Sequence, residues 1–233
     1  MSKRVAILQS NYIPWKGYFD IINSVNEFII YDNVQYTKND WRNRNRIKTS
    51  SGLQWLTIPV RQKGRLSLSL KINEIKTVDD TWRKKHWKSI AINYAKAKYF
   101  KNYSGIFENL YLNSGYTRLS DINFAFIKAI NKILGINTKL SWSTDYDMRE
   151  EIRTMRLVEL CTLSGATDYL SGPSAKGYID ESAFKKANIK ITWMDYSNYP
   201  EYCQLFPPFE HSVSVVDLVL NEGPNGTNYM KSF

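Results

Sequence analysis

Apolar and polar positions in the first 32 residues follow the order strand, helix, strand. Residues 5–9 form a short apolar run, residues 17–26 carry apolar side chains at helical spacing, and residues 27–32 form a second apolar run. This order predicts a βαβ unit with two parallel strands. The loop 10–16 and the segment 32–36 then meet at the carboxyl ends of the strands, where ligands bind in open α/β sheets.

The pattern beyond residue 54 predicts a mainly helical middle segment and then alternating strands and helices. A third strand is expected at 55–60, reached by a long loop at 38–48. One helix begins at 79–81 with an inward stripe of Trp82, His86, Ile90 and Tyr94, and others cover 103–112 and 120–134. Strands at 140–143, 168–171 and 189–194 alternate with helices at 150–163 and 180–186, and a last helix covers 213–220.

The predicted fold class is therefore α/β, with an open, mostly parallel sheet flanked by helices. The helical middle segment covers about 79–135, and the absence of a linker-like stretch predicts one α/β domain over residues 1–233. Hydrophobic residues make up 43% of the chain and charged residues 23%, which is typical of a globular protein.

Three features of the composition indicate a cytoplasmic protein. No apolar run approaches the roughly 18 residues of a membrane span, so membrane insertion is not expected. The apolar run near the first residue is too short for a signal peptide. Cys161 and Cys203 show no metal-binding or redox spacing, which favours a reduced compartment and structural thiols.

Positive charge is concentrated in the first half of the chain. The formal net charge is +10, made up of +12 in residues 1–117 and −2 in residues 118–233. The first half is therefore expected to bind an anion. Nucleic acid, nucleotide phosphates and an acidic carrier protein all remain open on charge alone.

The first loop and the end of the second strand contain the densest group of candidate ligand-binding side chains. Asp32 is a candidate proton acceptor or a metal ligand acting through water, and Gln35 is a candidate hydrogen-bonding group. The alternative interpretations are a turn cap for Asp32 and an aromatic staple for the loop. The substrate-binding candidates of the loop and the following helix start are Gln9, Asn11, Tyr12, Trp15, Gly17 and Tyr18.

The segment 41–48 alternates cations with amides. In an extended conformation Arg42, Arg44, Arg46 and Lys48 face one side, where guanidinium groups can bind a pyrophosphate in a bidentate way. Asn43 is a further substrate-binding candidate in this segment. A solvated basic loop and an RNA-binding surface are the alternatives, although no recognised RNA-binding signature is present.

The chain has two histidines, which excludes a histidine-rich metal site, and no metal site is predicted. His86 is the candidate general base, with a packed core histidine as the alternative. His211, in an expected loop, carries less weight. The turn containing Ser171, Gly172 and Tyr178 has the small residues and free backbone N–H groups of an anion nest, although a purely structural turn explains it nearly as well.

Taken together, these segments resemble the WbqC-like family almost from end to end. The resemblance covers QSNYIPWKGYFD (9–20), YDNVQ (31–35), WRNRN (41–45), WLTIP (55–59), the helix from Trp82 to His86, YLSG (169–172), YID (178–180), YPEYCQ (199–204) and SVVD (214–217). Gln204, at the end of YPEYCQ, joins the substrate-binding candidates. Many members have Gln-Pro or His-Gln-Pro at the first loop, whereas here Leu8 precedes Gln9 and Ser10 replaces the proline, which excludes a catalytic histidine there.

The resemblance implies an enzyme of O-antigen or other surface-polysaccharide biosynthesis. The implied reaction transfers an acyl or aminoacyl group, glycyl included, to the amine of a nucleotide-linked amino sugar. Such a reaction needs a proton acceptor, an anion clamp and oxyanion donors. Asp32 or His86 is assigned to the first role, the segment 42–48 to the second, and the Ser171–Gly172 turn or Asn11 to the third.

The acyl donor stays open between two classes. One is a thioester of coenzyme A or of an acidic acyl carrier protein, which suits the basic first half, and the other is a carboxylate activated by ATP. The absence of a recognised ATP motif favours the thioester. An RNA- or polyanion-binding module and a non-catalytic protein of a glycan pathway are the competing functions. The sequence does not determine the sugar, the donor or the oligomeric state.

Overall fold

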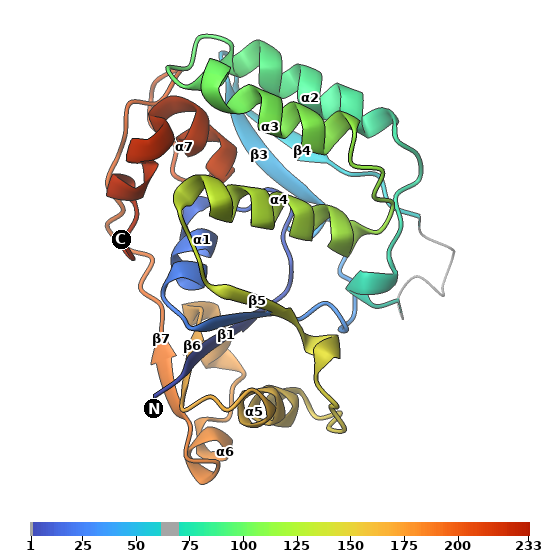
Figure 1. Ribbon diagram of the computed structural model, residues 1–233, viewed down its shortest axis with the longest axis vertical. Helices are drawn as coiled ribbons and strands as arrows, with labels where there is room; N and C mark the ends of the chain where they lie inside the picture. The colour runs from blue at the N-terminus through green and yellow to red at the C-terminus, as the bar shows by residue number, and fades with distance from the viewer. Residues whose placement is uncertain (1, 62–69) are drawn as a thin grey trace.

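Five parallel strands form the central sheet of the chain, whose computed structural model describes residues 2–61 and 70–233 (Figure 1). The strands are β1 (Arg4–Leu8), β2 (Glu27–Ile30), β5 (Lys139–Trp142), β6 (Asp168–Ser171) and β7 (Lys190–Trp193), in the order β5-β2-β1-β6-β7. The helix α1 (Lys16–Asn23) connects β1 to β2, so the predicted βαβ unit and parallel sheet are confirmed. The strand order reverses between β1 and β6.

Helices cover both faces of this sheet (Figure 1). Val5 and Ile7 of β1 pack in a core with α5 (Arg153–Leu163) and α6 (Glu181–Lys186), whereas Ala6 packs in the larger core on the other face. Alternate side chains of a strand point to opposite faces, which explains this division. The larger core contains α1, α2 (Thr81–Tyr94), α3 (Phe100–Leu112), α4 (Leu119–Leu134) and α7 (Val215–Glu222).

The helical middle segment is confirmed. The predicted inward stripe of α2, Trp82, His86, Ile90 and Tyr94, is buried. The helix α4 ends where predicted, because Gly135 takes the left-handed conformation, with φ of 71°, that closes a helix. Short 3-10 helices complete the described elements: η2 (Ile72–Glu74), η3 (Ser143–Asp145), η4 (Pro173–Gly177) and η5 (Gly223–Tyr229).

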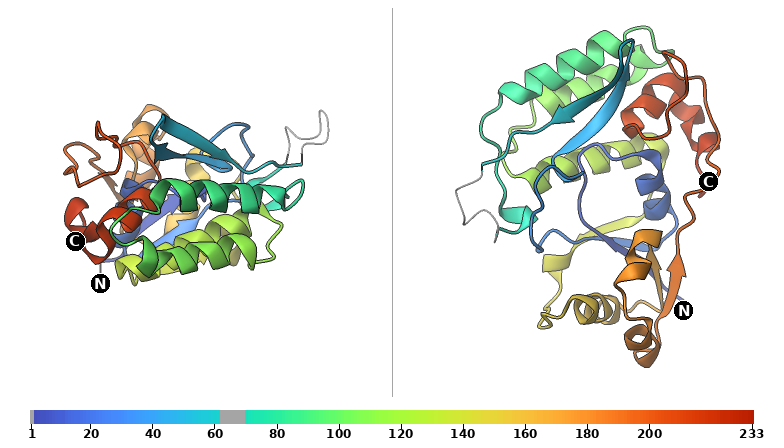
Figure 2. Two further views of the ribbon diagram at one scale, coloured as in Figure 1. Left: turned by 90° about the horizontal axis from the view of Figure 1, so that it is seen from above. Right: turned by 180° about the vertical axis from the view of Figure 1, so that it is seen from behind.

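The predicted loop at 38–48 is wrong from residue 44 onward, where a strand begins, and the strand predicted at 55–60 is observed with earlier bounds, Gly52–Thr57. The chain instead forms an antiparallel hairpin of β3 (Arg44–Thr49) and β4 (Gly52–Thr57), which lies beside α2 and apart from the main sheet (Figure 2). Ile47 is the only aliphatic side chain in β3, so the strand lacks the apolar run that the prediction required. Gly52, with φ of 101°, allows the turn between the two strands.

The segment 194–214 returns from the sheet to the hairpin without forming a helix or strand. At its end the Ser214 N–H donates to the Arg46 carbonyl and the Val215 N–H donates to the Pro14 carbonyl, both over 2.9 Å. The segment therefore joins the hairpin to the loop that follows β1.

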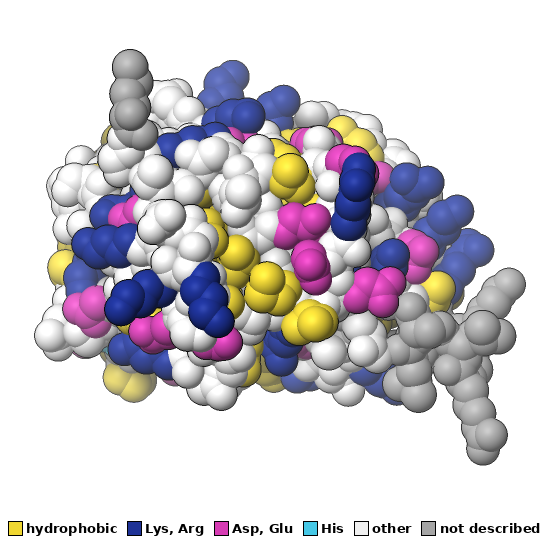
Figure 3. Space-filling view, turned by 90° about the horizontal axis from the view of Figure 1, so that it is seen from below, with side chains coloured by type: hydrophobic (Ala, Val, Ile, Leu, Met, Phe, Trp, Pro, Cys, Tyr) yellow, Lys and Arg dark blue, Asp and Glu magenta, His cyan; other side chains and the backbone are white. Residues whose placement is uncertain are grey.

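The outer face of α5 leaves three apolar side chains exposed, those of Ile152, Met155 and Leu163. Seen from below, hydrophobic side chains on the side of α5 and α6 form a narrow strip among acidic and basic ones (Figure 3). Across residues 2–61 and 70–233, no helix has the length and hydropathy that crossing a bilayer requires.

Candidate functional site

A pocket of about 280 Å³ lies where the loop after β1, the start of β3 and the C-terminal segment meet. It brings together two segments that the sequence placed at a site, the first loop and the arginine-rich segment. It adds a third, near His211. The lining residues are Asn11, Pro14, Trp15, Trp41, Asn45, Arg46, His211 and Ser212.

Backbone contacts hold the first loop against the hairpin. The Tyr12 N–H donates to the Trp41 carbonyl over 2.9 Å. The Asn45 side-chain amide donates to the carbonyls of Tyr12 (3.1 Å) and Ile13 (2.9 Å). Because both of its N–H groups are used, Asn45 shapes the pocket wall and presents no free donor to a ligand.

Gly17 is needed for the position of Trp15. A Cβ atom at residue 17 would lie 2.4–2.9 Å from three carbons of the Trp15 indole, closer than packing allows. The indole therefore occupies the space at the start of α1 where the sequence predicted an approach of ligand to backbone. Its other contacts are edge-on, with Tyr196 (5.2 Å between centroids) and Tyr199 (5.5 Å).

Two tryptophans and two arginines, Trp41, Arg44, Arg46 and Trp55, form a group that we call the indole–guanidinium cluster. The Arg44 and Arg46 guanidinium groups lie 4.3 and 5.3 Å from the centroid of the Trp55 ring. Arg46 also lies 6.0 Å from the Trp41 ring, and the two indoles are 5.6 Å apart. All of these contacts are within the range of cation–π and aromatic interactions.

Arg42 differs from the two cluster arginines because it is already paired. Its guanidinium lies 3.3 Å from the Asp40 carboxylate and donates to the Asn11 side-chain oxygen over 3.3 Å. In the part of the chain that the structure describes, neither Arg44 nor Arg46 forms an ion pair, and the buried Nε of Arg46 has no hydrogen-bond partner. Their charge is therefore available to an anion.

His211 reaches the pocket from the C-terminal segment. Its side chain is about half exposed, packs edge-on against Phe209 (4.7 Å between centroids), and has Nε2 3.9 Å from the Glu201 carboxylate. An imidazole at the mouth of a pocket, beside a carboxylate, is well placed to accept a proton. The sequence analysis assigned little weight to His211, since no periodicity or local motif marks residue 211.

His86 lies in the core and does not line the pocket. Its Nδ1 is 2.9 Å from the hydroxyl oxygen of Tyr12, which is itself 2.6 Å from that of Tyr111. Burial lowers the pKa of His86 to about 4, against the opposing effect of a hydrogen bond to the Thr57 backbone. These surroundings are typical of a packed core histidine, which was the alternative interpretation to a general base.

Asp32 lies at the end of β2 beside the first loop, as the topology predicts. Its carboxylate accepts hydrogen bonds from the Ser10 backbone (2.8 Å), the Ser10 hydroxyl (2.6 Å) and the Ser120 hydroxyl (2.5 Å). Burial raises the pKa of Asp32, and these hydrogen bonds oppose the rise. Asp32 is 1% exposed and does not line the pocket, and its bonds to Ser10 and Ser120 anchor the loop to α4.

Lys48 and Gln204 are brought together, but in a buried network. The Lys48 ammonium donates to the Gln204 side-chain oxygen over 2.6 Å and to the Pro208 carbonyl. Asp217 accepts hydrogen bonds from Gln204 (2.9 Å), Tyr94 (2.7 Å) and Tyr202 (2.6 Å). Burial lowers the pKa of Lys48 and raises that of Asp217. This network joins β3, α2 and α7.

The other predicted site residues lie outside the pocket. Ser171 is buried at the end of β6, and a Cβ atom added at the adjacent Gly172 would lie 3.9 Å from the Tyr196 ring. The exposed Tyr178 ring stacks on Arg153, whose guanidinium carbon is 3.8 Å from the ring centroid. Tyr18 donates to the Gln9 carbonyl over 3.0 Å. Asn43 is buried, and its side-chain amide donates a hydrogen bond to the Ile58 carbonyl. Gln35 is exposed and forms a β-bridge with Lys71.

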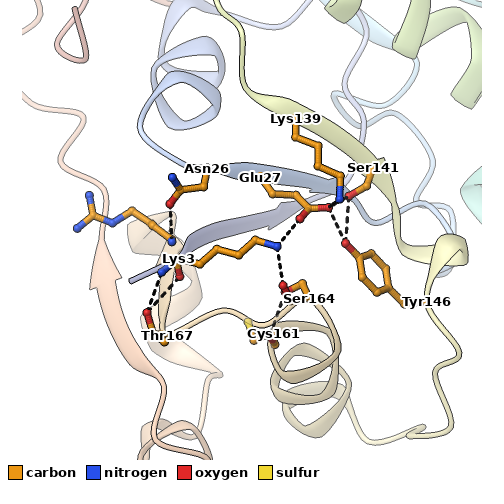
Figure 4. A network of polar contacts seen from close by, with 10 residues as sticks. Lys3, Asn26, Glu27, Lys139, Ser141, Tyr146, Cys161, Ser164 and Thr167 are labelled. Carbon is orange, nitrogen blue, oxygen red and sulfur yellow. Dashed lines mark hydrogen bonds and ion pairs between the residues drawn. The ribbon is translucent and has the colours of Figure 1, made fainter. Parts of the chain in front are cut away.

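Glu27, at the amino end of β2, is a further buried carboxylate, and it is surrounded by side chains that donate hydrogen bonds to it (Figure 4). Burial raises its pKa, but the hydrogen bonds from the surrounding side chains prevail and lower it to about 2. The cluster lies at the edge of the sheet opposite to the carboxyl ends, and it ties β2 to β5 and to the start of the chain. The donors are Lys3 (2.7 Å), Ser141 (2.6 Å), Tyr146 (2.5 Å) and Lys139 (2.9 Å).

The model of the WbqC-like protein family matches residues 9–229. This chain belongs to the WbqC-like protein family. It is also 48% identical over 229 residues to Rv1507c, an uncharacterized protein of Mycobacterium tuberculosis, with 98% of each chain covered. No solved structure matches the chain significantly.

The pocket of this WbqC-like chain is built mainly from segments that carried the resemblance. Asn11 and Trp15 belong to the segment 9–20, and Trp41 and Asn45 belong to the segment 41–45. His211 lies between the segments 199–204 and 214–217, outside any of them. His211 lines the pocket because the C-terminal segment returns from the sheet to the hairpin.

Proposed function

We propose that this WbqC-like protein is an enzyme of surface-polysaccharide biosynthesis that acylates the amine of a nucleotide-linked amino sugar in the pocket. The observation that carries the proposal is the combination of chemical groups around one small cavity. Indole faces of Trp15 and Trp41 suit the apolar face of a sugar ring, Arg46 suits a phosphate, and His211 suits an amine.

In the proposed reaction the sugar amine attacks the carbonyl carbon of an acyl or aminoacyl donor, which includes a glycyl donor. A C–N bond forms, the bond from the carbonyl carbon to the leaving group breaks, and the amine proton passes to His211. The Asn11 amide nitrogen has no acceptor among the described residues, so it is free to donate to the oxyanion or to a sugar hydroxyl. In this proposal His211 takes the role first assigned to Asp32 or His86.

A thioester is the proposed donor, carried by coenzyme A or by an acidic acyl carrier protein, and the thiol then leaves. The positive charge of residues 1–117 supports an anionic carrier. A carboxylate activated by ATP is the alternative donor. We place the reaction in the cytoplasm, where nucleotide-linked sugars are available.

The test is an end-point assay by mass spectrometry. The purified protein is incubated with nucleotide-linked amino sugars and, separately, with acyl-coenzyme A, acyl carrier protein thioesters, or a carboxylate with ATP. We expect a mass increase on the sugar that corresponds to amide formation, with one class of donor. No product with any donor overturns the proposed activity.

Two variants assign the chemistry to the pocket. His211→Gln is expected to reduce the rate by about 10²- to 10⁴-fold, the usual range for losing a general base. The matched control is Lys98→Gln, because Lys98 lies on an exposed position outside the pocket and the substitution leaves the pocket unchanged. Equal rates for both variants would remove His211 from the mechanism.

A further inference from the structure

The pocket is too small for the whole of the proposed substrate. Its volume of about 280 Å³ is just below the range of roughly 300–1,000 Å³ for pockets that enclose drug-sized ligands. A sugar ring fits such a space, but a sugar joined to a nucleoside diphosphate does not. If the sugar occupies the pocket, the nucleotide must lie on the surface next to it.

The indole–guanidinium cluster is the surface that continues from the pocket. Trp41 and Arg46 belong to both, and Trp55 and Arg44 extend the cluster along the hairpin. The two indoles are 40% and 43% exposed, although tryptophan usually buries most of its surface. Two adjacent, half-exposed indoles are typical of a binding surface.

The register of the hairpin explains why these side chains share one face. Arg46 lies opposite Trp55, and Arg44 lies opposite Thr57, two residues further along. Residues two apart on a strand point to the same side. Asn45 and Ile47 consequently point to the other side, where they are buried.

The charges of the cluster also indicate an anionic ligand. Arg44 and Arg46 lie against indoles and, among the described residues, have no carboxylate partner, in contrast to Arg42 with Asp40. A guanidinium that stacks on a ring keeps its N–H groups at the edge free to bind phosphate oxygens. An exposed indole face beside it can stack on a nucleobase.

We propose that the indole–guanidinium cluster binds a nucleoside diphosphate, with the diphosphate on Arg44 and Arg46 and the base on the indole of Trp55. The location of the sugar rests on the proposed function, whereas the binding of the nucleotide does not. The cluster is short: the next arginine, Arg42, is neutralised by Asp40, so the surface accommodates one nucleotide better than a strand of RNA.

The test measures binding without any reaction. Nucleoside diphosphates are titrated into the full-length protein by isothermal calorimetry, and the corresponding nucleoside and inorganic pyrophosphate are titrated separately. We expect the nucleoside diphosphate to bind more tightly than either part. Trp55→Ala and Arg44→Ala are each expected to weaken binding by about tenfold or more, because one loses base stacking and the other loses a phosphate contact.

Arg153→Ala is the matched control, because Arg153 is an exposed arginine that stacks on Tyr178 at 3.8 Å and does not line the pocket. It removes the same charge and a similar cation–π contact, and it should change the affinity less than twofold. Circular dichroism verifies that all variants are folded. The proposal is overturned if no nucleoside diphosphate binds, or if Trp55→Ala and Arg44→Ala weaken binding no more than Arg153→Ala.

Three further outcomes separate the alternatives. Tighter binding of an oligoribonucleotide than of a nucleoside diphosphate, lost in the same variants, would overturn the proposal in favour of RNA. Nucleotide binding that depends on the cluster, without acyl transfer to any amino sugar, would overturn the proposed function and support this subsite. If the protein transfers an acyl group and Trp55→Ala leaves the KM for the nucleotide-linked sugar unchanged, the proposed function is supported and this subsite is overturned.

Discussion

The two histidines of the chain lie in regions of opposite character. His86 is surrounded by Tyr12, Tyr111 and Trp82 in the core, and its hydrogen-bonding partners are internal. His211 is half exposed beside a pocket, where it packs edge-on against Phe209 and has a carboxylate, that of Glu201, at 3.9 Å. The residue type is the same, but the imidazole of His86 is hydrogen-bonded inside the core, whereas that of His211 is accessible to solvent.

The polar side chains of β3 also divide into those with internal hydrogen-bond partners and those without. Lys48 is bonded to Gln204 and buried under the C-terminal segment, whereas Arg44 and Arg46 pack on the Trp55 indole and, within residues 2–61 and 70–233, have no carboxylate partner. A buried polar group with all of its partners stabilises the fold, since breaking the set leaves unpaired atoms in the core. A polar group whose partners are absent is the better candidate for binding a ligand. Four changes test this division, and we describe them in order of expected effect on stability.

The largest effect is expected from Asp217→Ala. The change leaves the donors of Tyr94, Tyr202 and Gln204 buried without their acceptor. It should lower the free energy of unfolding by about 3–5 kcal/mol, measured by urea denaturation. Asp147→Ala is the control, since Asp147 forms an ion pair that is 84% exposed on both sides, and it should have almost no effect. Equal stability of the two variants would contradict a structural role for Asp217.

The second effect concerns the pH dependence of stability. In the folded protein burial lowers the pKa of His86 from 6.5 to about 4, so the unfolded chain binds a proton more readily. The contribution of His86 is present above about pH 6.5 and is lost as the pH falls towards 4. The free energy of unfolding should decrease by about 2–4 kcal/mol over this range through His86 alone.

His86→Gln tests that assignment, because glutamine can accept a hydrogen bond from Tyr12 but does not titrate. Urea denaturation at several pH values between 4 and 7 should show a smaller loss of stability for the variant than for the natural chain. Parallel curves for the two proteins would mean that the imidazole does not titrate in the core.

The third effect is expected from Gly17→Ala. The new Cβ would lie within 2.9 Å of three indole carbons of Trp15, and the variant should lose about 1–3 kcal/mol. Gly105→Ala, in the interior of α3, meets no atom within 4 Å and should gain about 0.5–1 kcal/mol from higher helix propensity. Thermal or urea denaturation compares the pair, and a stabilised Gly17→Ala would show that Trp15 does not need this space.

The smallest effect on stability is expected from His211→Gln. The side chain is about half exposed, so the free energy of unfolding should stay within about 0.5 kcal/mol of the natural value. Urea denaturation under identical conditions makes the comparison. A loss as large as that expected for Gly17→Ala would place His211 among the structural residues and would end its role as a proton acceptor.

Periodicity and residue type by themselves determined most of the fold. The βαβ unit, the inward stripe of α2 and the end of α4 at Gly135 follow from local patterns that depend on burial of one face or on backbone conformation. The hairpin β3–β4 did not follow, because its strands are stabilised by pairing with each other and by cover from distant segments. Alternating arginine and asparagine carries no apolar signal for such pairing.

The site depended on tertiary structure to a greater extent. The sequence indicated that the first loop and the segment 41–48 bind a ligand, and the fold brings both to one pocket. It did not distinguish the enclosed Asp32, His86 and Lys48 from the residues that line the pocket, the partly buried Arg46 and the half-exposed His211. Whether a polar side chain meets a protein partner or solvent is decided by residues far away in the chain, such as Ser120 for Asp32 and Gln204 for Lys48. Local sequence contains no record of those contacts.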